Sequence, residues 1–292
     1  MKHVYVSPHS DDVALSCGGQ ILANPARQAE VLVLNMFTSE SDSAGSSLFD
    51  SVNAQRTQED EAAWEGVGVP TAYANLPEAL LRKKFPFELK GPQDDPVVAD
   101  VSDVLADCAK SNPDATFHVP AGFGSHVDHL ACKRAAFRLL DQGRLGRIVL
   151  YEDVPYSWLR FVRSQYYRTL LRDVDITSES RKTAFRAEGE SFLTYLRRKQ
   201  VPFPRGKKLF PAVYLSLVAG NFGFRRSAAK YQGKLSVITL DAGQMAKKKK
   251  LIDHYRSQIP MLFGDDPEKL LGRLHDSFSK EVSIEVTRKG SH

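Results

Sequence analysis

Cysteine is scarce in this chain of 292 residues. Its three cysteines, Cys17, Cys108 and Cys132, lie far apart and form no CxxC pair. A small and odd number of cysteines excludes a disulfide framework. The absence of paired cysteines also disfavours a structural zinc site with thiolate ligands. We therefore expect three buried thiols that pack as small apolar groups.

Long hydrophobic runs are also missing. No stretch of about 18 apolar residues, the length that crosses a bilayer, occurs anywhere. The N-terminus, Met1-Lys2-His3, leads directly into a short apolar segment without the small-residue cleavage pattern of a secretory signal. With 42% hydrophobic and 26% charged residues, the composition is typical of a soluble globular domain. We expect a cytoplasmic protein without a transmembrane helix.

Three common motifs of α/β proteins are absent as well. No GxGxxG turn follows a predicted strand, which disfavours a dinucleotide-binding Rossmann domain. The chain has no P-loop, and it has no GxSxG, the nucleophile turn of the α/β-hydrolases. The catalytic or binding chemistry must therefore come from other residues.

Apolar segments alternate with amphipathic ones along the first half of the chain. We expect strands at residues 3–7, 29–37, 72–76, 115–120, 147–151 and 235–240. We expect helices at residues 12–22, 52–67, 97–109, 128–140 and 247–258. This alternation predicts an α/β fold with a Rossmann-like, mostly parallel sheet and helices on both faces. Ligands of such sheets bind at the carboxyl ends of the strands, so we expect the site after the first and fourth strands.

Basic residues are concentrated in one region. Residues 156–234 contain 17 Lys and Arg against 5 Asp and Glu, whereas the whole chain carries a net charge of +5. We interpret residues 1–292 as a single domain and residues 156–234 as a cap inserted into it. The excess charge suits an anionic partner, although a solvated basic surface would look the same. The run Lys247–Lys250 is expected at the exposed start of the last helix.

The first cluster of chemically active side chains is Pro8-His9-Ser10-Asp11-Asp12, directly after the first strand. One histidine and two carboxylates crowd into a turn between a strand and a helix. Two adjacent carboxylates repel each other unless a cation or a proton lies between them. Imidazole and carboxylate ligands together suit zinc and related divalent metals.

The second cluster, Ser125-His126-Val127-Asp128-His129, follows the fourth strand. Ser125 is a candidate N-cap, and the two histidines, three residues apart, can project from one face of the first helical turn. Because both clusters are expected at the same edge of a parallel sheet, together they predict a metal site.

The two clusters resemble the PIG-L/LmbE superfamily of zinc-dependent de-N-acetylases. The residues that carry this likeness are PHSDD and, about 115 positions later, HVDH. Enzymes of that superfamily hydrolyse the acetamide of N-acetylglucosaminyl groups. Its first motif is usually (A/S)-H-P-D-D-E, so Ser10 in place of proline and Val13 in place of glutamate mark a divergent member. The likeness covers residues 3–155 well and 235–260 in part.

The resemblance implies a role for each matching residue. His9, Asp12 and His129 would bind zinc and leave one position open for water, as in catalytic zinc sites. Asp11 would be the general base, and His126 a second acid–base group near the developing oxyanion and the leaving amine. Asp128 would orient His126 or a metal ligand through a hydrogen bond. Iron or manganese is an alternative metal, because two histidines and a carboxylate accept several.

Weaker likenesses lie outside these clusters. Arg56 and Glu59 match an Arg-x-x-Glu helix of the family, and Tyr255-Arg256-Ser257-Gln258 resembles its Tyr-x-Ser-Gln. Arg56 would hold sugar hydroxyls or a phosphate with its planar guanidinium. Glu78 would bind a sugar hydroxyl. Tyr255 and Gln258 are expected to be structural.

The activity implied is removal of an N-acetyl or other N-acyl group from a small amino-sugar conjugate, including anionic ones. One alternative is an inactive carbohydrate-binding or scaffold protein of the same fold. Asp11 and His126 argue against it, because metal binding alone needs neither. Another is binding of nucleic acid through residues 156–234, which contain no known nucleic-acid-binding motif.

Overall fold

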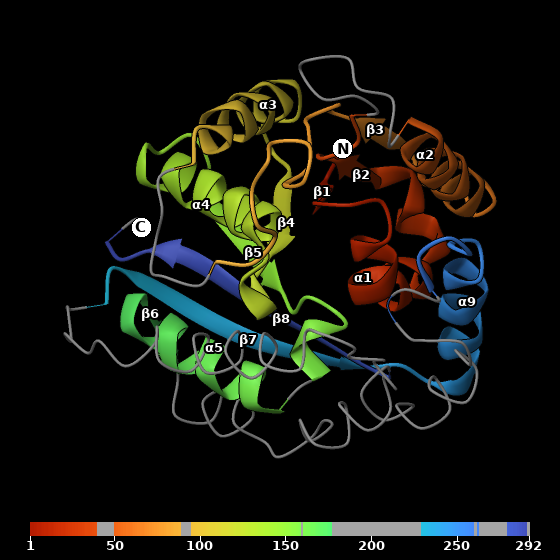
Figure 1. Ribbon diagram of the computed structural model, residues 1–292. Coiled ribbons are helices and arrows are strands. Elements are labelled where there is room, and N and C mark those ends of the chain that lie inside the picture. Colours follow the sequence, from red (N-terminus) through yellow and green to blue (C-terminus); the bar gives the residue numbers. More distant parts are fainter. Residues whose placement is uncertain are drawn as a thin grey trace.

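The computed structural model describes residues 1–39, 50–88, 95–158, 160–176, 229–259, 262 and 279–290 (Figure 1). Their framework is an eight-stranded sheet of order β3-β2-β1-β4-β5-β8-β7-β6. Neighbouring strands are parallel, except that β8 runs antiparallel to both β5 and β7. The strands are β1 (His3–Ser7), β2 (Val31–Asn35), β3 (Thr71–Tyr73), β4 (Thr116–Pro120), β5 (Arg147–Tyr151), β6 (Val174–Ile176), β7 (Tyr231–Thr239) and β8 (Lys280–Arg288).

Helices cover both faces of this sheet (Figure 1). They are α1 (Asp12–Ala23), α2 (Asp50–Glu65), α3 (Val97–Ser111), α4 (Val127–Asp141), α5 (Arg160–Asp173) and α9 (Ala242–Ile252). Short 3-10 turns are η1 (Pro25–Glu30), η3 (Phe123–Ser125) and η4 (Tyr156–Trp158). Among the described helices, none combines the length and the apolar composition that a bilayer crossing requires.

The central strand β1 explains why the core has two layers. Successive side chains of a strand point to opposite faces. Val4 and Val6 accordingly belong to the core that contains α3 and α4, whereas Tyr5 belongs to the core that contains α1 and α9. Because β1 is buried on both faces, its sequence is continuously apolar between His3 and Ser7 rather than alternating.

The predicted fold class is confirmed, and most predicted elements lie within a few residues of the observed ones. The last predicted helix spans Ala242–Ile252 rather than residues 247–258, and it begins earlier because Asp241 caps it. The Asp241 side chain accepts the N–H of Gln244, whose side chain in turn accepts the N–H of Asp241. Three elements were not predicted: α5, β6 and β8. Residues 280–288 do alternate apolar and polar side chains, so β8 carries a readable signal.

Two expectations about burial were wrong. Lys248 is not part of an exposed helix start; it is 1% exposed, and its Nζ lies 2.7 Å from Oε1 of Glu281. The reason is that α9 packs directly against α1, so this face of α9 is an interface. Cys108 is half-buried rather than buried, whereas Cys17 and Cys132 are buried as expected.

The predicted cap falls largely on residues 177–228, which lie outside the described residues. Of its described ends, β6 and the start of β7 belong to the sheet, and α5 precedes β6 directly. The cap therefore stays a prediction.

Candidate metal centre

The predicted site residues meet at one edge of the sheet. Strands β1 and β4 are parallel neighbours, so their carboxyl ends lie side by side. His9 and Asp11 lie in the turn after β1, and Asp12 is the first residue of α1. Asp128 and His129 lie in the first turn of α4, whose N-cap is His126. Residues about 115 positions apart are thereby brought within contact distance.

His9, Asp12 and His129 form one group that could hold a metal ion. Oδ2 of Asp12 lies 3.3 Å from Nδ1 of His9 and 3.2 Å from Nε2 of His129. Nε2 of His129 is buried, and it has no hydrogen-bond partner among the described residues. A buried nitrogen without a partner is costly, and a bound cation would relieve that cost. This group therefore fits a metal ion well.

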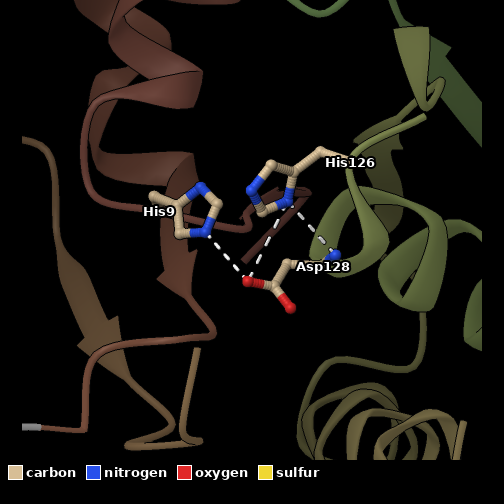
Figure 2. Close-up of side chains that lie close together, drawn as sticks. All are labelled: His9, His126 and Asp128. Carbon is tan, nitrogen blue, oxygen red and sulfur yellow. Dashed lines mark hydrogen bonds and ion pairs between the residues drawn. The ribbon is translucent and has the colours of Figure 1, made fainter. Parts of the chain in front are cut away.

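His9, His126 and Asp128 form a second possible group (Figure 2). Nε2 of His9 lies 3.1 Å from Oδ2 of Asp128, and Nδ1 of His126 lies 4.0 Å from the same oxygen. Both oxygens of Asp128 already have donors: Ala79 N–H at 3.1 Å and Nη2 of Arg82 at 2.8 Å. The positive guanidinium beside this carboxylate disfavours a cation, so the first group is the better metal site.

Asp128 contacts His9 more closely than it contacts His126. The ring of His126 instead caps α4, because its Nδ1 accepts the backbone N–H of Asp128 at 3.3 Å. The prediction that Ser125 is the N-cap was wrong. Ser125 lies one residue earlier, in η3, with a positive φ of 60°.

Asp153 belongs to the site and was missed by sequence reasoning. It is 0% exposed, and its Oδ1 lies 2.6 Å from Nδ1 of His129. Its Oδ2 accepts the backbone N–H groups of Gly122 at 2.7 Å and Phe123 at 3.0 Å. Its position two residues after β5, a neighbour of β4, is a signal that could have identified it.

The two adjacent carboxylates have opposite electrostatic environments. Burial and the negative charge of Asp12 raise the pKa of Asp11 to about 6. Burial also opposes ionisation of Asp12, but the nearby charges of His129 and His9 hold the pKa of Asp12 well below its usual range. Asp12 is thus an ionised group suited to a cation, whereas Asp11 can exchange a proton near neutrality.

The two histidines of α4 also diverge. Burial, together with the charges of His9 and His129, lowers the pKa of His126 to about 3. For His129 burial acts in the same direction, but the negative charge of Asp12, followed by the hydrogen bond to Asp153, raises its pKa to about 9. In the absence of metal, His129 therefore holds the proton that a cation would replace.

The predicted substrate contacts lie together. Nη1 of Arg56 is 3.5 Å from Oε2 of Glu78, and the side chains are 21% and 14% exposed. The charge of Arg56 lowers the pKa of Asp11, although less than burial raises it. The structure thus pairs Arg56 with Glu78.

The two segments that carry the weaker sequence likenesses contact each other. Glu59 accepts the N–H of Ser257 at 3.0 Å and its hydroxyl at 2.7 Å. Tyr255 donates its hydroxyl to Asp60 at 2.7 Å. The buried Asp60, which sequence reasoning did not select, also accepts hydrogen bonds from Asn35, Trp64 and Tyr73. These contacts join α2 to the segment after α9.

Comparison with known proteins gives two kinds of likeness. Residues 4–140 match the family described as PIG-L, GlcNAc-PI de-N-acetylase. The 2'-N-acetylparomamine deacetylase of Streptomyces fradiae is 34% identical over an alignment of 167 positions that covers 54% of this chain. The match spans only 59% of the length of that relative.

Solved structures share the fold. The zinc-inhibited form of teicoplanin deacetylase Orf2 aligns over 100% of both chains with a TM-score of 0.61 at 16% identity. A deacetylase–bog complex from the teicoplanin biosynthesis pathway aligns over 100% of both chains with a TM-score of 0.62 at 17% identity. At these identities the likeness concerns the architecture alone.

Proposed function

We propose that this chain, of which residues 4–140 match the PIG-L family of de-N-acetylases, is a metal-dependent hydrolase that removes an N-acetyl or other N-acyl group from an amino sugar or a sugar conjugate. The observation that carries the proposal is the meeting of His9, Asp12 and His129 around a buried nitrogen that has no hydrogen-bond partner among the described residues, with Asp11 adjacent in the chain. The proposed ligands and the proposed base thus lie at one edge of the sheet.

Zinc is the metal we propose for this site. Two imidazole nitrogens and one carboxylate oxygen are a usual catalytic zinc set, with one position left for water or substrate. When bound, the metal would supply Lewis-acid polarisation of the acyl carbonyl. Iron or manganese could serve with the same ligands.

Asp11 is the general base in this proposal. It accepts a proton from the water whose oxygen attacks the acyl carbon, and it can pass that proton to the nitrogen when the C–N bond breaks. Asp12, which faces both histidines, stays with the metal. The two neighbouring carboxylates therefore have different tasks.

His126 is placed to donate a hydrogen bond to the reacting amide. Its Nδ1 accepts the N–H of Asp128, so in the neutral ring the proton lies on Nε2. That N–H would donate a hydrogen bond to the carbonyl oxygen as it becomes negative, or to the leaving nitrogen. Because Asp128 contacts His9, its proposed role is to orient this metal ligand.

Arg56 and Glu78 are the proposed contacts for the sugar. A guanidinium and a carboxylate 3.5 Å apart offer donors and acceptors to neighbouring hydroxyl groups. The relative named for 2'-N-acetylparomamine supports an N-acetylated amino sugar as the substrate class.

The test measures metal content and acetate release from a panel of N-acetylated amino sugars that includes 2'-N-acetylparomamine. We expect Asp11→Ala to keep its metal but to lose about 10²–10⁴-fold in turnover, as for other general bases. His129→Ala should lose both metal and turnover. Asp107→Ala, at an exposed carboxylate of α3, is the control and should match the wild type.

Two results would count against the proposal. Asp11→Ala that turns over at the wild-type rate would remove Asp11 from the mechanism. Metal bound by the wild type without release from any acetylated sugar would favour the alternative of a carbohydrate-binding protein.

A further inference from the structure

We propose that Asp153 is a positioning residue that fixes the ring orientation and the tautomer of His129, so that Nε2 is presented to a cation. This inference rests on the proposed metal site. Asp153 is not itself a proposed metal ligand; it contacts the ligand His129 and acts through it.

Three donors converge on the carboxylate of Asp153. Oδ2 accepts two backbone N–H groups, from Gly122 at 2.7 Å and Phe123 at 3.0 Å. Backbone N–H groups can only donate, so they favour the ionised carboxylate. Oδ1, 2.6 Å from Nδ1 of His129, is then an acceptor as well. Nδ1 must therefore carry the hydrogen.

The consequence appears on the other side of the ring. With hydrogen on Nδ1, the lone pair of a neutral His129 lies on Nε2. Nε2 is buried, has no hydrogen-bond partner among the described residues, and lies 3.2 Å from Oδ2 of Asp12. Both His129 and Asp153 are at most 1% exposed, so their contact is shielded from bulk water.

Asp153 also ties the metal ligand to the sheet. It follows β5, whereas Gly122 and Phe123 precede α4, the helix that carries His129. One carboxylate therefore fixes both the ring and the turn that leads into its helix. Such carboxylate partners of ligating histidines typically contribute 10- to 100-fold to metal affinity.

Asp153→Asn is the informative substitution, and Glu152→Gln is its matched control. An asparagine has one acceptor oxygen and one NH₂ group, so it leaves at least one of the three donors facing another donor. Glu152 is adjacent and also largely buried, but its Oε1 receives Arg163 and Tyr167 rather than His129. We expect a 10- to 100-fold loss of zinc affinity in Asp153→Asn, measured by competition with a chromophoric chelator, and no loss in Glu152→Gln.

A second measurement needs neither zinc nor activity. In metal-free wild type, at a pH high enough to leave the His129 ring neutral, nitrogen-15 NMR of the histidine side chains reports the tautomer, with His129 assigned by comparison with His129→Gln. We expect hydrogen on Nδ1. This readout decides the question even if Asp153→Asn fails to fold.

A neutral, metal-free His129 with its hydrogen on Nε2 rather than Nδ1, or zinc affinity in folded Asp153→Asn equal to that of the wild type, would overturn the inference. A wild type that binds zinc with the expected dependence on Asp153 but deacetylates nothing would instead overturn the proposed function. The two failures are therefore distinguishable.

Discussion

At the scale of single residues, His118 makes a prediction about acid stability. This residue of β4 is 8% exposed, and its ring stacks on Tyr5 with centroids 4.0 Å apart. Burial, followed by the charges of His3 and Arg147, lowers its pKa to about 3. An unfolded histidine has a pKa of about 6.5, so the unfolded chain binds more protons than the native one below that pH. The contribution of neutral His118 is complete above pH 6.5 and is lost as the pH falls toward 3.

We expect His118→Phe, which keeps an aromatic ring on Tyr5, to weaken this pH dependence. Below pH 6 the free energy of unfolding of the wild type should fall more steeply, by up to about 1.4 kcal/mol per pH unit. Urea denaturation at pH 7, 6 and 5 measures the slope, with His254→Gln as the control. Equal slopes for the wild type and His118→Phe would show that His118 titrates normally in the native state.

The same scale shows why some site residues could be predicted and others could not. His9, Asp12 and His129 lie in two short clusters at predicted strand ends, so their chemistry was visible in the sequence. Asp153 is a single carboxylate without a neighbouring motif. Its contact with His129 depends on β4 lying beside β5, which the sequence near Asp153 does not reveal. Lys248 was misplaced because its partner, Glu281, lies in a strand that was not predicted.

At the scale of elements, the junction of α1 with α9 and β8 depends on Gly19. A Cβ at this position would lie 2.1 Å from Cδ1 of Leu240 and 2.8 Å from Oε1 of Glu281. The backbone N–H of Gly19 also donates to Oε1 of Glu281 at 2.8 Å, the oxygen that pairs with Lys248. The elements can approach this closely only because the side chain is absent.

Gly19→Ala should therefore destabilise the fold despite the higher helix propensity of alanine. Overpacking typically costs about 1–3 kcal/mol, and displacement of Glu281 from its buried pair would add to that. Gly146→Ala is the control, because a Cβ there meets nothing within 4 Å. Chemical denaturation compares the two. A Gly19→Ala protein as stable as Gly146→Ala would mean that α9 can move away from α1 at little cost.

Element boundaries followed the sequence where local chemistry sets them. Strand β1 and helix α1 lie within one residue of the predicted ranges, because an apolar run ends at the polar turn that starts the helix. Strand β6, with three residues, is too short to produce a periodic pattern, and its place is decided by pairing with β7. The local sequence of one strand does not predict which distant strand it pairs with.

At the scale of the whole molecule, the parallel half of the sheet was predictable and its antiparallel extension was not. Alternating strands and helices lead to parallel neighbours, and the chain returns from β3 to the other side of β1, which places the ends of β1 and β4 together. Strand β8, by contrast, inserts between β5 and β7 from the far end of the chain. Its place is set by long-range contacts of Val282, Ile284 and Val286 in the core, which depend on the complete fold.

The proposed metal would join segments that the chain itself leaves far apart. His9 and Asp12 follow β1, His129 follows β4, and Asp153 behind it follows β5, so zinc would link the ends of three adjacent strands.

A ligand that binds only the native state at 1,000 times its Kd stabilises it by about 4 kcal/mol, which for a chain of this size is on the order of 10 °C in Tm. We expect removal of metal with a chelator to lower the Tm of the wild type by about that amount, and zinc to restore it. His129→Ala should show no such shift. Should zinc raise the Tm of His129→Ala as much as that of the wild type, the stabilising metal binds elsewhere, and the edge formed by β1, β4 and β5 does not hold it.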